Sequence, residues 1–361
     1  MSLMTHFAKW RTAILKRSPL FTLSRSLLLS KITAPIPDWM ETRIEKDLAF
    51  YEKSGINSQK IENTLKKTRA TGNWEAAKLY RLRIKENRLI TQDNIYAIKD
   101  RRLLKLLFFF RTLLRKIQLP DTEFLISTSD IFEEPTFLEC QDAPVFFISK
   151  TSTNHRSCLF PHIVWLNYWS HLRQRLTTLS VKWPFENRSE LLFWRGSTTG
   201  FDPMHLNFTR QKVIELSHCY PAEIDAAFSN VVQQNKHKKK FTTQSFLEPE
   251  NHLRYKYLLA LDGNCFPGSF FWQLASGSIV FKNDSPFLEW YYEGLKPFVH
   301  YIPFAQDGSN LLERKQWTQA NPANGAHCAI NARKFAHEFL TNEGIATFVY
   351  FLLKKYAKLF S

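Results

Sequence analysis

Residues 256–281, KYLLALDGNCFPGSFFWQLASGSIVF, decide the fold class of this chain. Two short apolar runs, one at each end of the stretch, have the length and composition of buried strands. A glycine-bearing turn follows the first run, and residues 269–276 have the pattern of a helix. A strand, a turn, a helix and a second strand at this spacing predict a parallel α/β sheet.

The same alternation extends over most of the chain. Strands are also expected at 143–150, 191–194 and 298–304, and a short strand within 119–130 ends at Asp130. Helices are expected at 38–56, 58–70, 74–89, 101–118, 158–176, 207–220, 286–295, 329–340 and 344–360. We therefore predict an α/β fold with two Rossmann-like domains that face a central cleft, preceded by extra N-terminal helices.

Four segments are expected along the chain. Residues 1–36 form a basic amphipathic segment, residues 37–180 an N-terminal α/β domain, and residues 181–340 a C-terminal Rossmann-like domain. Residues 341–361 form a C-terminal helix that can pack back on the first domain. Because ligands of open parallel sheets bind beyond the carboxyl ends of the strands, the loops at those ends are the candidate sites.

The composition is that of a folded protein with an anionic partner. Hydrophobic residues make up 44% and aromatic residues 15% of the 361 residues, which excludes a disordered chain. The formal net charge of +16 points to nucleic acid, an acidic membrane surface or a phosphorylated small molecule. The charge alone does not distinguish these three partners.

Cysteine usage and the first forty residues indicate where the protein works. The five cysteines include no C-x-x-C pair, so free thiols in a reducing compartment are expected. The first forty residues place lysines and arginines among apolar positions and lack an apolar run long enough for a secretory signal or a membrane span. They are expected to lie on an anionic membrane surface as amphipathic segments, or alternatively to form an ordinary helix packed on the domain.

The first candidate loop, residues 195–200 with the sequence RGSTTG, follows a predicted strand directly. Gly196 permits a tight turn, and Arg195 and the hydroxyls of Ser197 and Thr198 can donate to phosphate oxygens. Arg210, near the start of the next helix, can reach the same anion. The alternative is a plain turn with a structural arginine.

The second candidate loop lies in the stretch that decides the fold. Gly263 and Asn264 close the strand, and Gly268 and Ser269 lead into the helix. A helix start with uncovered amides and a positive dipole end attracts a diphosphate. An ordinary strand-to-helix connection would have the same pattern.

Asp130 ends a predicted strand and is the candidate general base. A carboxylate at the tip of a strand can take up a proton if it reaches the reacting group. A cap on the following turn is the alternative role, and Glu133 and Glu134 are competing carboxylates. The chain has no D-x-D, H-E-x-x-H or G-x-S-x-G motif, so no metal or other cofactor is expected.

Taken together in order, these loops resemble glycosyltransferase family 90. That family includes the Rumi-type protein O-glucosyltransferases and bacterial lipopolysaccharide core transferases. The likeness begins near residue 36 and is most specific at 277–304, GSIVFKNDSPFLEWYYEGLKPFVHYIPF. The stretches LPDTEFLISTSD, FFISKTS and WRGSTTG fall in the order and at the spacing of the family.

The resemblance implies a GT-B fold and metal-independent, inverting transfer of a hexose or pentose from a UDP-sugar. It implies that Asp130 is the catalytic base, that Ser197 approaches the donor diphosphate, and that Arg210 matches a further donor-site arginine. Many members carry an arginine where this chain has Ser269, so a diphosphate contact is either lost or supplied by another residue. Glu289 is expected at the start of a late helix, where its carboxylate either accepts hydrogen bonds from the ribose hydroxyls of the donor or stabilises the helix dipole.

The expected partners are a UDP-sugar, a glycan or lipid-linked glycan acceptor and an anionic membrane surface. Lipopolysaccharide core or a related surface glycan is the first expectation for the acceptor, in a cytoplasmic enzyme on the inner membrane face. Protein O-glucosylation is the rival within the family. A basic nucleic-acid-binding protein is a rival from another class, although no nucleic-acid module is present, and a non-catalytic glycan-binding relative is a third.

Overall fold

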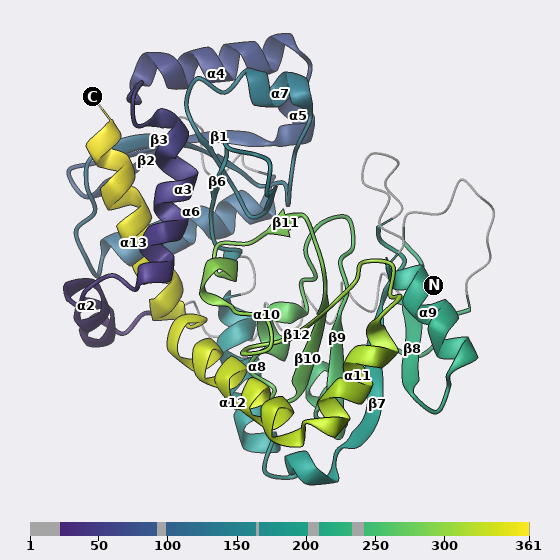
Figure 1. Ribbon diagram of the computed structural model, residues 1–361. Helices are drawn as coiled ribbons and strands as arrows, with labels where there is room; N and C mark the ends of the chain where they lie inside the picture. Colours follow the sequence, from purple (N-terminus) through teal and green to yellow (C-terminus); the bar gives the residue numbers. More distant parts are fainter. Residues whose placement is uncertain (1–21, 92–98, 164–165, 201–208, 233–241, 361) are drawn as a thin grey trace. The chain divides into compact units, whose positions relative to one another are not determined.

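The computed structural model describes residues 22–91, 99–163, 166–200, 209–232 and 242–360 (Figure 1). The described residues divide into two compact units. Unit 1 contains Tyr168–Ser285 and Leu295–Leu340, and unit 2 contains residues 22–167, Pro286–Gly294 and 341–360. Most of the basic N-terminal segment and the lysine-rich stretch at 236–240 lie outside the described residues.

Unit 1 is built on a parallel sheet of five strands. The strands are β7 (Ser189–Ser197), β8 (Ile224–Asn230), β9 (Tyr255–Ala260), β10 (Ile279–Asn283) and β12 (Ile302–Phe304). Their order across the sheet is β12-β10-β9-β7-β8. Numbered in chain order and read from the β8 edge, this is 2-1-3-4-5, so the sheet is doubly wound and its winding reverses between β7 and β9.

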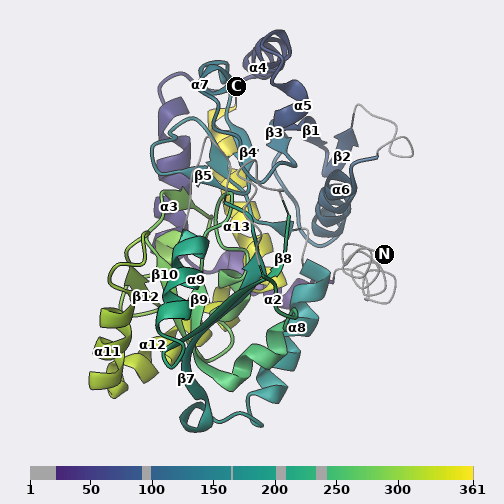
Figure 2. The ribbon, with the colours of Figure 1, turned by 90° about the vertical axis from the view of Figure 1, so that its right-hand side faces the viewer.

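Helices cover both faces of this sheet. They are α8 (Leu166–Leu179), α9 (Thr209–Cys219), α10 (Phe270–Gln273), α11 (Leu311–Ala320) and α12 (Pro322–Phe339). Val213 of α9, Leu311 of α11 and Cys328 of α12 share one buried cluster with Leu192 and Phe281 of the strands. In Figure 2, α11 and α12 lie on one side of the strands and α8 on the other.

Unit 2 contains a mixed sheet in the order β2-β1-β3-β4-β6. Its strands are β1 (Leu79–Lys85), β2 (Arg88–Thr91), β3 (Thr122–Ser127), β4 (Val145–Phe147) and β6 (Cys158–Leu159). Strands β3, β4 and β6 are parallel, whereas β1 is antiparallel to both of its neighbours. A small second sheet pairs β5 (Lys150–Thr151) with β11 (Phe287–Leu288).

The helices of unit 2 come from both ends of the chain. They are α2 (Arg25–Thr33), α3 (Asp38–Leu48), α4 (Ser58–Ala70), α5 (Trp74–Ala77), α6 (Arg101–Leu114), α7 (Pro135–Glu139) and α13 (Asn342–Leu359). Helix α13 packs against α2 and α3. Its Tyr356 is buried in an aromatic core. The ring centroid of Phe146 lies 5.4 Å from that of Tyr356 and 5.3 Å from that of Phe124. Among the described helices, none is long and apolar enough to cross a membrane.

The unit boundary differs from the one expected at residue 180. Helix α8 belongs almost wholly to unit 1, where the indole of its Trp169 donates a hydrogen bond to the Leu340 carbonyl and contacts the Phe271 ring. Residues Pro286–Gly294 leave unit 1 for unit 2, because β11 pairs with β5 there. These contacts join residues far apart in the chain, so local sequence patterns do not reveal them.

The helix predicted at 74–89 is wrong. After the short helix α5, residues 79–91 form the β1–β2 hairpin, and its turn places Glu86 at φ 50° and Asn87 at φ 56°. Leu82 and Ile84 are buried while Arg83 is exposed, which is the two-residue period of a strand. Arg81 and Arg83 both pair with the buried Glu123 of β3.

Four other predicted elements change in the structure. The helix expected at 158–176 begins only at Leu166, and Cys158–Leu159 form strand β6 instead. The helix expected at 286–295 is replaced by strand β11 and the single 3₁₀ turn Tyr292–Gly294. The helix expected at 269–276 is regular only over the four residues of α10. The strand expected at 298–304 begins at Ile302, because Phe298 takes φ 60° and the amides of Val299 and His300 donate to the Lys296 carbonyl in a turn.

Candidate functional site

The two predicted loops meet at one place in unit 1. Residues 197–200 begin at the last residue of β7, and residues 261–265 follow β9. These strands are neighbours, and the winding of the sheet reverses between them. In doubly wound sheets this switch point, at the carboxyl ends of the strands, opens a crevice in which ligands bind. We call these two segments the paired loops.

Arg210 ties the paired loops together. Its Nη1 donates to the Ser197 carbonyl at 2.8 Å and to the Thr199 hydroxyl, while its Nε donates to the Asp262 carbonyl at 2.9 Å. Nη2 donates to the Leu261 carbonyl at 3.1 Å. Burial lowers the pKa of Arg210 to about 10, and the nearby Asp262 opposes that effect. The guanidinium therefore remains charged at neutral pH and sets the spacing of the loops.

Gly263 and Asn264 complete this junction. A Cβ added to Gly263 would lie 2.6 Å from the Thr199 hydroxyl oxygen and 2.8 Å from Arg210 Nη2, so any larger residue would force these side chains to shift. The Asn264 side chain accepts a hydrogen bond from the Gly200 amide at 2.8 Å. The amide of Gly263 donates to the Cys265 carbonyl, so it is not available to a ligand.

The polar groups at the junction are hydroxyls and an amide side chain. Ser197 and Thr199 are partly exposed, and their hydroxyl oxygens lie 3.5 Å apart. Gly268 is exposed and Ser269 partly so, just before α10. Because α10 has only four residues, it offers little of the helix dipole expected at this position. The hydroxyls and Asn264 are therefore the best placed donors to an anion.

Arg195 and Thr198 face away from this cluster. Arg195 donates to the Asp225 carboxylate at 2.6 Å and to the Gln244 side chain, and 9% of its side chain is exposed. Thr198 is buried, and its hydroxyl donates to the Val232 carbonyl at 2.6 Å. Gly196 lies against the Trp194 ring and leaves no room for a Cβ. In this structure Arg195 is thus a structural arginine.

Asp130 lies in unit 2, in the loop that leaves β3. Its side chain is 44% exposed, and Oδ1 accepts a hydrogen bond from Arg102 Nη1 at 2.6 Å. Its carbonyl accepts from the Ser149 amide at 3.0 Å. Glu133 accepts hydrogen bonds from the Thr151 amide and from Asn154, which gives it a structural role. Asp130 is therefore more available than Glu133.

Glu289 also lies in unit 2, directly after β11 rather than at a helix start. It is 3% exposed and accepts a hydrogen bond from the Tyr291 hydroxyl at 3.0 Å. The pKa of Tyr291 is raised well above its ordinary value, mainly because the hydroxyl is buried and also because the negative charge of Glu289 lies beside it. The predicted contact of Glu289 with ribose stays a prediction.

Sequence reasoning missed Arg102 and Asp100, which both contact the Asp130 loop. The only sequence signal was an aspartate immediately before a strong helix pattern, which is typical of an N-cap. Within the ranges that the structure describes, no group of three His, Cys, Asp or Glu side chains is placed to hold a metal ion.

The fold and the switch-point loops define a doubly wound α/β protein. A sequence profile described as Glycosyl transferase family 90 matches residues 34–361, nearly the whole chain, and the chain belongs to this family. The resemblance drawn from its motifs is thereby confirmed.

Two curated relatives share the family. Human Protein O-glucosyltransferase 1 is 29% identical over 260 residues, which cover 68% of this chain and 64% of the relative. Protein O-glucosyltransferase 2 of Danio rerio is 27% identical over 260 residues, covering 70% of this chain and 50% of the relative. The chain thus spans about half to two thirds of the length of these relatives.

A solved structure is also similar to this chain. It is Anabaena Alr3699/HepE in complex with UDP-glucose, with 10% identity and a TM-score of 0.37 over 62% of this chain and 59% of that chain. A score this low supports no argument about the site.

Proposed function

We propose that this chain is an inverting glycosyltransferase that moves a hexose or pentose from a UDP-sugar to an acceptor hydroxyl. The observation that carries the proposal is the junction of the paired loops at the switch point of the unit 1 sheet. Membership of Glycosyl transferase family 90 supports the reaction class. The names of the two relatives favour glucose as the sugar.

The paired loops receive the UDP diphosphate. The hydroxyls of Ser197 and Thr199 and the side chain of Asn264 donate hydrogen bonds to its oxygens, and buried Arg210 adds positive charge behind them. Donors fixed before the reaction stabilise the charge that develops on the departing UDP. No divalent cation is required in this proposal.

Asp130 acts as the general base. It takes the proton of the acceptor hydroxyl, whose oxygen attacks the anomeric carbon from the face opposite the UDP. The bond between the anomeric carbon and the phosphate oxygen breaks, and UDP leaves with the electron pair. One displacement of this kind inverts the configuration at the anomeric carbon.

Two acceptor classes are supported by different observations. The net charge of +16 fits a phosphorylated, lipid-linked surface glycan such as lipopolysaccharide core, handled at the inner face of the cytoplasmic membrane. The relatives, which are named protein O-glucosyltransferases, favour a protein hydroxyl instead. UDP release from a panel of UDP-sugars, with deacylated lipopolysaccharide or with serine-bearing protein acceptors, separates the two classes.

The experiment that tests the reaction is Asp130→Asn. This variant is expected to bind UDP as the wild type does and to lose at least about 100-fold in transfer rate, because the amide cannot accept the proton. Both proteins are assayed with and without EDTA, and EDTA is expected to leave the wild-type rate unchanged.

Wild-type turnover in the Asp130→Asn variant would remove Asp130 from the mechanism. A rate that EDTA abolishes and Mg²⁺ or Mn²⁺ restores would overturn the metal-free reaction. Salt-sensitive DNA binding without measurable affinity for UDP would favour a nucleic-acid-binding protein, and glycan binding without UDP release would favour a non-catalytic relative.

A further inference from the structure

The N-terminal end of α6 holds the loop that carries Asp130. Asp100 caps this helix, since its Oδ1 accepts from the amides of Arg102 at 2.8 Å and Leu103 at 3.3 Å. Its Oδ2 accepts from the Thr128 hydroxyl at 2.5 Å and from the Tyr80 hydroxyl at 3.0 Å. One carboxylate therefore joins the helix start, the β1 strand and the loop after β3.

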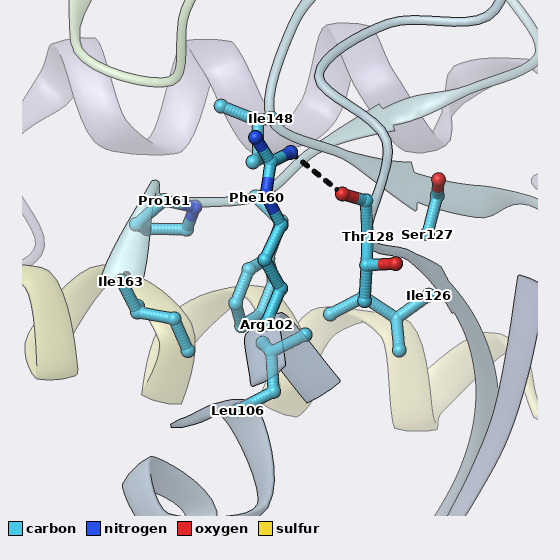
Figure 3. A pocket seen from close by; sticks show the side chains of 9 residues that line it. All are labelled: Arg102, Leu106, Ile126, Ser127, Thr128, Ile148, Phe160, Pro161 and Ile163. Atoms are coloured by element: carbon cyan, nitrogen blue, oxygen red, sulfur yellow. Dashed lines mark hydrogen bonds between the residues drawn. The ribbon is translucent and has the colours of Figure 1, made fainter. Parts of the chain in front are cut away.

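Arg102 makes the second connection from α6 to this loop. Its Nη1 donates to the Thr128 carbonyl at 2.8 Å and to Asp130 Oδ1 at 2.6 Å, so one nitrogen contacts both ends of the segment 128–130. Figure 3 shows the first of these bonds and the arginine stem beside apolar side chains of a small pocket. The apolar lining of this pocket comes from Leu106, Ile126, Ile148, Phe160, Pro161 and Ile163.

This arrangement limits the freedom of both side chains. The apolar walls restrict the Arg102 stem, and the Thr128 carbonyl fixes the direction of its guanidinium. Arg102 then holds Oδ1 of Asp130, while no side chain or backbone amide of the described residues donates a hydrogen bond to Oδ2. One oxygen of the carboxylate is anchored and the other is left to accept a proton.

The ion pair is poorly suited to a purely stabilising role. The Arg102 and Asp130 side chains are 36% and 44% exposed, and exposed pairs of this kind contribute little to stability. Catalysis is far more sensitive, because a misplacement of about 1 Å in a reacting group can cost about 100-fold in rate.

We propose that Arg102 is a positioning residue for the general base, and that Asp100 and Arg102 together fix the Asp130 carboxylate for proton uptake. The inference rests on the proposed function of Asp130. It assigns Arg102 no contact with the sugar or the UDP.

The test uses the full chain with the variants Arg102→Gln and Arg102→Lys. UDP release from UDP-glucose is measured with water as the acceptor, since water needs the same base. Arg102→Gln is expected to lower kcat about 10- to 100-fold with the KM for UDP-glucose within about twofold of wild type. Arg102→Lys is expected to recover part of kcat, because an ammonium can contact Asp130 but cannot match the fixed guanidinium fork.

Arg101→Gln is the matched control, since it removes the same charge from an exposed position in the same helical turn. It is expected to keep the wild-type kcat. In the Asp130→Asn background, Arg102→Gln is expected to have no further effect, because the base that it positions is already absent. A merely structural arginine would instead lower the rate in both backgrounds.

The outcomes separate this inference from the proposed function. If Asp130→Asn abolishes turnover and Arg102→Gln does not lower kcat, the positioning role is overturned while the base assignment stands. If Asp130→Asn retains turnover, Asp130 is not the general base, and the positioning role of Arg102, which rests on it, falls as well. Crystal structures of the wild type and Arg102→Gln give a readout independent of activity: a displaced Asp130 carboxylate supports the proposal, and an unmoved carboxylate overturns it.

Discussion

Gly263 is the residue at which the smallest chemical change would disturb the paired loops. A methyl group there would lie 2.6 Å from the Thr199 hydroxyl oxygen and 2.8 Å from Arg210 Nη2. Arg210 is buried and bonded to three backbone carbonyls, so it cannot move aside without losing them. The spacing of the loops would have to change instead.

Gly263→Ala is therefore expected to destabilise the protein by about 1–3 kcal/mol and to weaken UDP binding about tenfold. Denaturant unfolding measures the first effect and titration calorimetry with UDP the second. Gly268→Ala is the control for stability, because a Cβ at that position meets no atom within 4 Å. Equal stability of the two variants would show that the junction tolerates a wider spacing.

The sequence allowed the candidate residues to be named but not the direction of their side chains. Arg210 was expected near the first loop and lies there, yet its partners are carbonyls of Ser197, Leu261 and Asp262. Arg195 was expected to face an anion, and Asp225, thirty positions later, holds it instead. Motifs specify which side chains are present, whereas strand pairing decides which of them meet.

Among the elements, α13 contributes most clearly to the core of unit 2. Its Phe348 is fully buried, and its ring lies 4.9 Å from the Trp290 ring in the segment after β11. This contact joins two parts of the chain that unit 1 residues separate in sequence. The helix is thus an integral part of unit 2 rather than an appendage.

Phe348→Ala is expected to lower the free energy of unfolding of unit 2 by about 3–5 kcal/mol, because it leaves a cavity in a closed core. Calorimetry should show a lower transition temperature for that unit. Phe351→Ala, in the same helix but only partly buried, should cost clearly less. A loss below about 1 kcal/mol for Phe348→Ala would mean that the core closes around the gap.

Element prediction succeeded for the apolar helices α6 and α13 of unit 2, and failed where charged residues alternate with apolar ones, as in β1. In unit 1 the strands expected at 191–194 and at both ends of 256–281 are present as β7, β9 and β10, whereas strand β8 and helix α11 were not predicted. The parallel sheet confirms the α/β class. The sequence pattern predicts a helix across the β1–β2 hairpin because charged residues continue past the helical Trp74–Ala77. The alternation of apolar Leu82, charged Arg83 and apolar Ile84 is the signal that distinguishes a strand from a helix in this segment.

At the scale of the whole molecule, the charge of +16 supports a further prediction. The protein is expected to sediment with vesicles that contain anionic lipids at low salt and to be released near 1 M salt, where the screening length falls to about 3 Å. Neutral phosphatidylcholine vesicles are the control. No binding to anionic vesicles at low salt, or equal binding to neutral ones, would contradict a membrane-surface role.

The division of the chain between its two units also bears on how it is synthesised. Within the described residues, the chain passes from one unit to the other after residues 167, 285, 294 and 340. On the ribosome, every described residue of unit 1 leaves the exit tunnel before α13 does. The unit 1 sheet can therefore close in the nascent chain while Phe124 and Phe146 of unit 2 still lack their contacts with Tyr356. Apolar surface exposed in this way during folding favours aggregation.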